Sequence, residues 1–349
     1  MHNLLIYGAN GYTGQLIVEE AVNKGLKPIL GGRNKAAINA LAEQYKLEAR
    51  VFDLSDREAV LSNMEDIYLV IHCAGPFEYT CLPMIEACFA TNTHYIDITG
   101  EIWVFEKLKS FDQPAKEAGI MFLPGAGFDV VPTDCLAAYL KDKMPNATKL
   151  ELAFSNLGGG PSHGTALTAV ENLHRKNYVR ENGKLAEKPQ GHATKMIDFG
   201  EVKHHCMSIP WGDVSTAYVS TGIPNIIVYM GLPKKMLKWV RLGNYIRPLL
   251  KMEWVKNMIR KRIKKQPAGP SPEARAKGKS CLWGQVSDDK GNKVEARLVT
   301  PEGYTLTART AVLIASKVLS TDYKTGFQTP STAYGYGLIL EVEGVTSFN

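Results

Sequence analysis

The stretch that decides the fold is residues 4–18, LLIYGANGYTGQLIV. An apolar run of strand length leads into a turn with glycine at every third residue, and a helical apolar spacing then continues to about Lys24. Gly8 lets the chain leave the strand sharply, Gly11 removes a side chain where a pyrophosphate approaches, and Gly14 lets helix and strand pack closely. The free N–H groups at the start of the helix favour phosphate. The residues predicted to contact a dinucleotide here are Gly8, Asn10, Gly11, Tyr12, Thr13 and Gly14.

The composition is that of a globular protein with room for two domains. With 349 residues, of which 45% are hydrophobic and 22% charged, each domain has enough chain for its own core. No apolar run reaches the roughly 20 residues of a membrane-spanning helix, and the opening run is too short for a signal peptide. The six cysteines are scattered without a Cys-x-x-Cys pair, so we expect a reduced, cytoplasmic location with neither a disulfide framework nor a metal site.

The end of the second predicted strand, residues 27–30, indicates which dinucleotide binds. An acidic residue about 20 positions beyond the glycines would bind the ribose 2′-hydroxyl of NAD, whereas an arginine holds the 2′-phosphate of NADP. Arg33 occupies this position, followed by Asn34, and its guanidinium can both fork onto phosphate and stack on adenine. NADP is therefore favoured over NAD, the alternative being a solvated surface arginine. Asp53, at the end of the third strand, either lies beside the adenine or caps the next helix.

Strands alternate with helices as far as Leu123, which predicts a parallel, doubly wound sheet of the Rossmann type. Ligands of such sheets lie outside the carboxyl ends of the strands. After the fourth strand, residues 68–72, the small and rigid turn formed by Ala74, Gly75, Pro76 and Phe77 therefore predicts a wall beside the nicotinamide ribose, or simply a loop.

From Lys149 onward the pattern changes to alternating strands, with a hairpin signalled by residues 289–292. This predicts a second α+β domain on a mixed or antiparallel sheet that binds substrate. The expected division is residues 1–130 for the Rossmann domain, 131–325 for the substrate domain, and 326–349 for a segment that packs back on the first domain through a helix from 330 to 341.

The basic charge of the chain is concentrated in residues 234–265, where twelve Lys or Arg residues face Glu253 alone. The apolar residues Leu250, Trp254, Val255, Met258 and Ile259 share one face of a predicted helix. Three uses of this segment remain open: docking on an anionic membrane surface, a lid or homodimer element, or a packed helix with a solvated basic face. Nucleic-acid binding is not expected, because no groove-reading or base-stacking motif accompanies the charge.

Several stretches together resemble the saccharopine dehydrogenase-like oxidoreductases, including the group of trans-acting enoyl reductases. The matching stretches are residues 8–14, 73–77, 95–101, 127–134, 164–165 and 326–330. The resemblance implies a Rossmann domain, a substrate domain inserted before the final helix, and a nicotinamide cofactor that is most often NADP. It does not name the substrate.

These observations predict an NADP-dependent oxidoreductase that transfers a hydride between the nicotinamide and a C=O, C=N or C=C bond of a small organic or lipid-like molecule. A proton donor must lie on loops at the strand ends, and the candidates are Asp97, Asp129 and His163, each of which also has a purely structural interpretation.

Two other functions remain open. One is a non-catalytic NADP-binding sensor or scaffold at a membrane surface. The other is a short-chain dehydrogenase-type reductase that uses Tyr139 and Lys143, although the serine such enzymes carry upstream is replaced here by Ala126.

Overall fold

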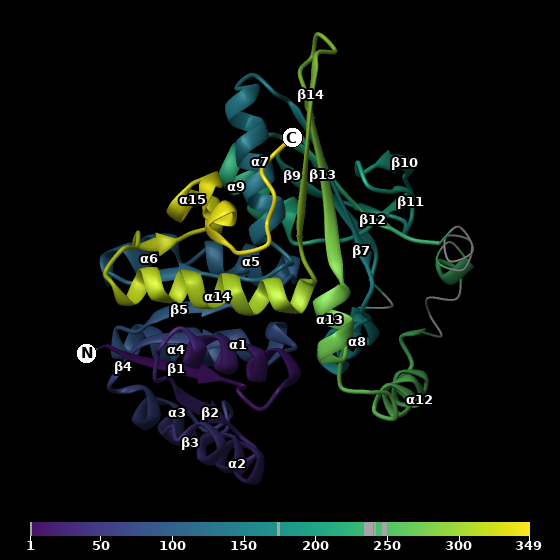
Figure 1. The fold of residues 1–349 in the computed structure, drawn as a ribbon. Helices are drawn as coiled ribbons and strands as arrows, with labels where there is room; N and C mark the ends of the chain where they lie inside the picture. The colour runs from purple at the N-terminus through teal and green to yellow at the C-terminus, as the bar shows by residue number, and fades with distance from the viewer. Residues whose placement is uncertain (1, 173–174, 234–239, 241, 246–249) are drawn as a thin grey trace. The chain divides into compact units, whose positions relative to one another are not determined.

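The computed structural model describes residues 2–172, 175–233, 240, 242–245 and 250–349. It divides the chain into two compact units, coloured along the sequence in Figure 1. The first unit contains residues 1–131 and 304–334, and the second contains 132–303 and 335–349. The chain therefore returns to the first unit at Tyr304 rather than at residue 326, and its last residues belong to the second unit.

The first unit is built on a seven-stranded sheet in which every paired strand is parallel, in the order β15-β6-β5-β4-β1-β2-β3. Its strands are β1 (Asn3–Tyr7), β2 (Ile29–Gly32), β3 (Ala49–Val51), β4 (Ile67–His72), β5 (His94–Asp97), β6 (Met121–Leu123) and β15 (Gly326–Phe327). Its helices are α1 (Tyr12–Asn23), α2 (Lys35–Tyr45), α3 (Arg57–Met64), α4 (Phe77–Thr91), α5 (Ile102–Lys109), α6 (Asp112–Glu117), α14 (Gly303–Leu319) and α15 (Pro330–Tyr334). The predicted Rossmann architecture is confirmed.

The sequence of the first unit explains its layers. The central strands β1 and β4 are almost continuously apolar because they are buried on both faces, as in other parallel sheets. Helix α1 packs on the sheet through Gly14, Ile17, Val18 and Ala21, the spacing of one helical face. Strand β1 pairs with β2 on one side and β4 on the other, so the order in which the chain adds parallel strands to the sheet reverses between β1 and β4. Dinucleotides bind at such a reversal.

Helix α14 is the reason why the chain returns to the first unit so early. Its apolar residues Ala311, Ile314 and Ala315 are fully buried. The Thr310 hydroxyl donates to the Ala126 carbonyl oxygen at 2.7 Å, and the Thr307 hydroxyl accepts from the backbone N–H of Phe128 at 3.0 Å. Helix α14 therefore supports the loop after β6.

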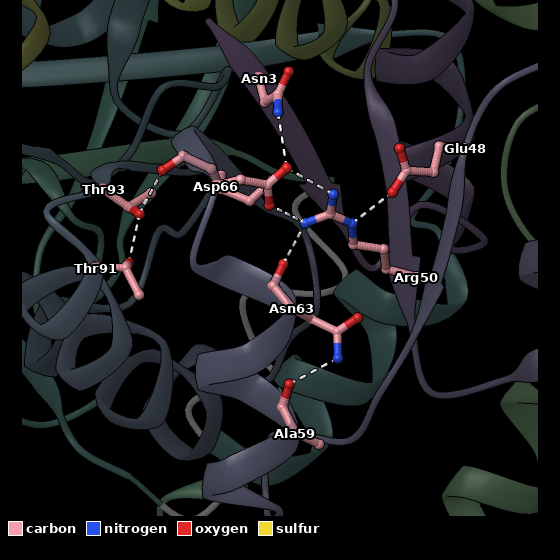
Figure 2. Close-up of polar contacts among 9 residues, drawn as sticks. Asn3, Glu48, Arg50, Ala59, Asn63, Asp66, Thr91 and Thr93 are labelled. Atoms are coloured by element: carbon pink, nitrogen blue, oxygen red, sulfur yellow. Dashed lines mark hydrogen bonds and ion pairs between the residues drawn. The ribbon is translucent and has the colours of Figure 1, made fainter.

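Arg50 joins three elements at the edge of the sheet where β1 and β4 begin (Figure 2). Its guanidinium forks onto Asp66, which also accepts from Asn3 at 2.9 Å, and it donates to Glu48 and to the Asn63 carbonyl oxygen, both at 2.7 Å. These hydrogen bonds, with that from Arg50 first, lower the pKa of Asp66. The cluster lies at the amino edge of the strands, so it stabilises the sheet and leaves the carboxyl edge to the ligand.

The second unit contains an eight-stranded mixed sheet. Six strands follow the order β10-β11-β12-β7-β13-β14, and β8 and β9 form a side ladder on β12. The pairing of β7 with β12 is parallel, whereas its pairing with β13 is antiparallel. The strands are β7 (Lys149–Leu157), β8 (Asn177–Glu181), β9 (Lys184–Lys188), β10 (Thr194–Asp198), β11 (Lys203–Ser208), β12 (Asn225–Gly231), β13 (Lys279–Ser287) and β14 (Lys293–Pro301). The predicted mixed sheet and the hairpin between β13 and β14 are both present.

The described helices of the second unit are α7 (Val131–Lys143), α8 (His163–Asn172), α9 (Asp213–Thr221), α12 (Glu253–Ile263), α13 (Pro272–Lys277) and the 3-10 helix η1 (Tyr336–Glu341). The predicted closing helix from 330 to 341 is thus two pieces, because Gly335 has φ of 78° and breaks it between α15 and η1. Within the described ranges, none of the helices has the length and apolar character needed to span a bilayer. Of the basic segment, residues 234–239, 241 and 246–249 lie outside the described residues.

Candidate functional site

The glycine turn after β1 has the close contacts that its spacing predicts. Gly8 has φ of 82°, and a Cβ at Gly14 would lie 2.3 Å from the Gly8 carbonyl oxygen, so any larger residue at either position would force the turn open. Gly11 occupies the N-cap position of α1 and provides no side-chain cap. The first N–H groups of α1 are therefore not covered by a capping side chain, as a phosphate site requires.

The loop after β4 lies directly against this turn. A Cβ on Gly8 would meet the backbone nitrogen of Ala74 at 2.8 Å. The Thr80 hydroxyl donates to the Ala74 carbonyl oxygen at 2.7 Å and lies 3.0 Å from Nε2 of His72. His72 is fully buried, and burial lowers its pKa to about 3, so it is a neutral hydrogen-bonding partner. The pair of His72 and Thr80, which the sequence analysis missed, positions the loop from Ala74 to Phe77.

Arg33 follows β2 at the same edge of the sheet. Its side chain is exposed, and it forms neither a hydrogen bond nor an ion pair within the described ranges, in contrast to the fully engaged Arg50. Asn34 caps α2 by accepting from the N–H of Ala37 at 3.2 Å. Asp53 accepts from the N–H and hydroxyl of Ser55, and these bonds, with a smaller effect of Arg33, lower its pKa. Asn34 and Asp53 thus have local structural roles, and Arg33 remains free to bind a phosphate.

Asp97, at the end of β5, braces the loops around it. Its carboxylate accepts three hydrogen bonds: from the Tyr95 hydroxyl at 2.7 Å, and from the N–H groups of Thr99 and Gly125 at 2.9 Å each. Burial raises its pKa to about 7 against the opposing effect of these bonds. Because Asp97 is fully buried and its oxygens are engaged, the geometry favours a structural role over proton donation.

Asp129 differs from Asp97 in having a carboxylate with no hydrogen-bond donor among the described residues. It follows β6 and packs against Gly100, whose Cβ, if present, would lie 2.5 Å from Oδ2 of Asp129. Burial raises the pKa of Asp129 to about 7, and the nearby Glu101 carboxylate adds to the effect. Asp129 therefore exchanges a proton near neutral pH.

Glu101 is a site residue that the sequence analysis did not select. Its two carboxylate oxygens accept from the N–H groups of Phe77 at 2.8 Å and Glu78 at 2.9 Å, so it covers the N-terminus of α4. This leaves the uncapped start of α1 as the better site for phosphate. The order Thr99, Gly100, Glu101 after a strand end was visible in the sequence, but its partner helix was not.

His163 begins α8 in the second unit. Its Nε2 lies 2.8 Å from the Gln266 carbonyl oxygen, and its backbone N–H donates to the Ala268 carbonyl oxygen at 2.8 Å. These two contacts join α8 to the loop that follows α12, so a structural role accounts for the position of this histidine. In the part of the chain that the structure describes, no cluster of three or more His, Cys, Asp or Glu residues has the arrangement of a metal site.

Tyr139 of the Tyr-x-x-x-Lys sequence lies on α7 of the second unit. Its ring stacks on Phe348 with the centroids 4.4 Å apart and meets Tyr336 edge to face. Lys143 lies over the same ring, 5.2 Å from its centroid, and pairs with Asp142. The Tyr139 ring thus packs the C-terminal residues against α7, which favours a packing role over proton transfer.

The chain has two domains, and the parallel sheet of the first, with the glycine turn at the carboxyl edge of its strands, is that of a dinucleotide-binding Rossmann domain. Residues 4–123 match the saccharopine dehydrogenase NADP binding domain. The predicted resemblance to saccharopine dehydrogenase-like oxidoreductases and the NADP-binding character of the domain are thereby confirmed.

Known relatives and structures agree with this resemblance. A saccharopine dehydrogenase-like oxidoreductase of Bos taurus is 24% identical over 204 residues, covering 51% of this chain and 48% of the relative. A protein of Mycobacterium tuberculosis named as a trans-acting enoyl reductase is 27% identical over 185 residues, covering 49% of this chain and 44% of the relative. The match thus spans about half the length of each relative. Apo saccharopine dehydrogenase (L-Glu forming) of Saccharomyces cerevisiae superposes over 98% of this chain and 96% of its own with a TM-score of 0.66 at 13% identity, which shows a shared fold.

The cytoplasmic location predicted from the cysteines is overturned by two further relatives. One, 23% identical over 54% of this chain and 47% of its own, is named as a mitochondrial saccharopine dehydrogenase-like oxidoreductase of Arabidopsis thaliana. The other, 24% identical over 46% of this chain and 41% of its own, is the lipid droplet localized protein of Caenorhabditis elegans. Reduced cysteines are compatible with several compartments, so they could not decide this point.

Proposed function

We propose that this protein is an NADPH-dependent reductase that transfers a hydride to a C=O, C=N or C=C bond of a small organic or lipid-like substrate. The observation that carries the proposal is the Asp129 carboxylate, which lies near Glu101 at the carboxyl edge of the Rossmann sheet and accepts no hydrogen bond from the described part of the chain. A carboxyl group with a pKa of about 7 is matched to general acid catalysis at neutral pH.

The residues of the first unit divide the work of binding. The start of α1 receives the pyrophosphate, Arg33 holds the 2′-phosphate, and the loop from Ala74 to Phe77 forms the wall beside the nicotinamide ribose. When bound, NADPH supplies the hydride. Asp129 holds a proton on its carboxyl group and donates it to the substrate atom that becomes negative, and the charge of Glu101 keeps that proton in place. We assign the second unit to substrate binding.

The test of cofactor choice is a fluorescence titration of NADPH and NADH with the wild type, Arg33→Ala and Arg57→Ala. Arg57 is an exposed arginine of the same unit, at the start of α3, and serves as the matched control. A charge-assisted hydrogen bond contributes about 1.5–3 kcal/mol, so Arg33→Ala should weaken NADPH by about 10- to 100-fold. The affinity for NADH should stay within about twofold, and Arg57→Ala should behave as the wild type. An equal loss for both nucleotides would remove Arg33 from the 2′-phosphate site.

The test of catalysis is NADPH oxidation with a panel of aldehydes, imines and conjugated enoyl compounds. With an active substrate, Asp129→Asn should lower kcat by about 100-fold or more while NADPH affinity is retained, because general acids contribute about 10²–10⁴-fold. Glu65→Gln, at an exposed site in the same unit, is the control and should leave kcat unchanged. Tight NADPH binding without turnover of any of these compounds would favour the sensor or scaffold function instead.

A further inference from the structure

Helix α12 of the second unit exposes two large apolar side chains and buries a lysine, whereas most helices do the opposite. This observation is independent of the proposed function. The sequence pattern placed Trp254 and Met258 on one apolar face of the helix and left open whether that face packs on the domain or docks elsewhere. In the structure they are 63% and 60% exposed, whereas the cationic Lys256 is only 8% exposed. A helix that buries a lysine and exposes a tryptophan needs a specific explanation.

The inward face of α12 is explained by Glu171 on α8, the helix beside it in Figure 1. One oxygen of Glu171 lies 3.1 Å from Nζ of Lys256, and the other accepts from Nε of Arg260 at 3.0 Å. Arg260 also donates to Glu253 at 2.8 Å. Lys256 and Arg260 are four residues apart, so together they turn one face of α12 onto α8.

The outward face carries the exposed residues of α12, whereas Val255, Ile259 and Ile263 are half-buried. Trp254, Met258, Lys261 and Arg262 follow the spacing i, i+4, i+7 and i+8, which places them on one side of the helix. Exposed cations flank this side, and among the described residues none of them has an acidic partner: Lys251, Lys261, Arg262, Lys264 and Lys265. We call Trp254, Met258 and these five cations the α12 face.

We propose that the α12 face docks on an anionic lipid surface. An indole and a thioether surrounded by unpaired cations is the composition of a helix that lies in the plane of a bilayer interface, where tryptophan is enriched and anionic headgroups attract lysine and arginine. The distribution of the cations favours lipid over an acidic protein. The arginine that needs exact geometry, Arg260, is used inward on Glu171, whereas four of the five outward cations are lysines, flexible point charges that suit a diffuse negative surface.

The experiment is co-sedimentation of the full chain with two kinds of vesicle: pure phosphatidylcholine, and phosphatidylcholine with about 30% phosphatidylserine. The wild type should bind the anionic vesicles at low salt, bind the neutral ones weakly, and lose anionic binding as salt is raised. Each cation near an anionic surface contributes about fivefold to the partition coefficient, so Lys261→Glu with Arg262→Glu should lower it by about 25-fold or more. Trp254→Ala should weaken binding to anionic vesicles as well, because it removes the apolar ring that we expect to insert into the lipid interface.

The matched control is Lys290→Glu with Lys293→Glu, which makes the same change in net charge at exposed positions of the hairpin between β13 and β14. This variant should retain at least about half of the wild-type binding. All variants should show the wild-type circular dichroism spectrum, because the substituted side chains are exposed. Equal binding to neutral vesicles, no binding to either vesicle, or an equal loss in the control would overturn the proposal. A change in the monomer–dimer equilibrium with unchanged vesicle binding would instead assign the α12 face to contacts between copies.

Discussion

The substitution Asp129→Asn should stabilise the protein at alkaline pH, although we propose that it lowers kcat by about 100-fold or more. The ordinary pKa of an aspartate is 3.8, and burial next to Glu101 raises that of Asp129 to about 7. Between these values the folded protein holds a proton that the unfolded chain has lost. Unfolding therefore releases a proton, and the free energy of unfolding falls as pH rises from about 4 to about 7.

The size of the effect follows from the same two values. One pKa unit corresponds to about 1.36 kcal/mol, so above pH 7 the charged Asp129 costs the fold about 4 kcal/mol. Asparagine has nearly the shape of a protonated aspartate and cannot ionise. Asp129→Asn should thus raise the free energy of unfolding by about 4 kcal/mol at pH 8 but by only about 1 kcal/mol at pH 4.5.

The assay is urea denaturation followed by circular dichroism at both pH values, for the wild type, Asp129→Asn and Glu65→Gln. The difference between Asp129→Asn and the wild type isolates Asp129 from Asp97, whose pKa is also raised to about 7 and which both proteins retain. Glu65→Gln, at an exposed carboxylate, should differ little from the wild type at either pH. An equal gain at pH 4.5 and pH 8, or no gain at all, would refute the reasoning that burial strains this carboxylate.

Three further predictions test the rest of the first unit and the rival motif. Gly14→Ala should lose NADPH binding in a titration and about 1–3 kcal/mol of stability in a thermal melt, because its Cβ would lie 2.3 Å from a carbonyl oxygen. The control Gly337→Ala, whose Cβ would face open space, should change neither property. Asp97→Ala should cost about 3–6 kcal/mol in a denaturant titration, because three buried donors lose their acceptor, and Asp97→Asn should cost much less because one oxygen still accepts. Tyr139→Phe should leave kcat within about twofold in the NADPH assay, and a hundredfold loss would revive the short-chain dehydrogenase mechanism.

The hydrogen bonds around Asp129 explain how the first unit can hold a buried carboxylate that lowers its free energy of unfolding. Asp97 accepts hydrogen bonds from the loops after β5 and β6 and so fixes both loops. Helix α14 supports the second of these loops through Thr307 and Thr310. The loop is thus fixed by other residues, and no residue that the structure describes donates to the Asp129 carboxylate. Residues that cost stability in this way are concentrated at functional sites.

Local patterns in the sequence were sufficient for the glycine turn, the parallel sheet and the NADP-binding character of the domain. Gly8, Gly11 and Gly14 act within one turn of chain, and the proposed role of Arg33 rests only on its place after β2. The alternation of strand and helix then determines the layers, because parallel strands must be joined by crossovers. The same reasoning predicted a mixed sheet in the second domain from its hairpin and its alternating strands.

Only the tertiary structure separated the three candidate acids and oriented α12. Asp97 and Asp129 look alike in the sequence, and they differ because donors from distant loops reach one carboxylate and not the other. Glu101 acquires its role from α4, which begins 24 residues earlier in the chain. In α12, Lys256 and Arg260 turn toward Glu171 on α8, and Trp254 is left exposed. Periodicity reports which residues share a face, but the partner that the face meets comes from elsewhere in the chain.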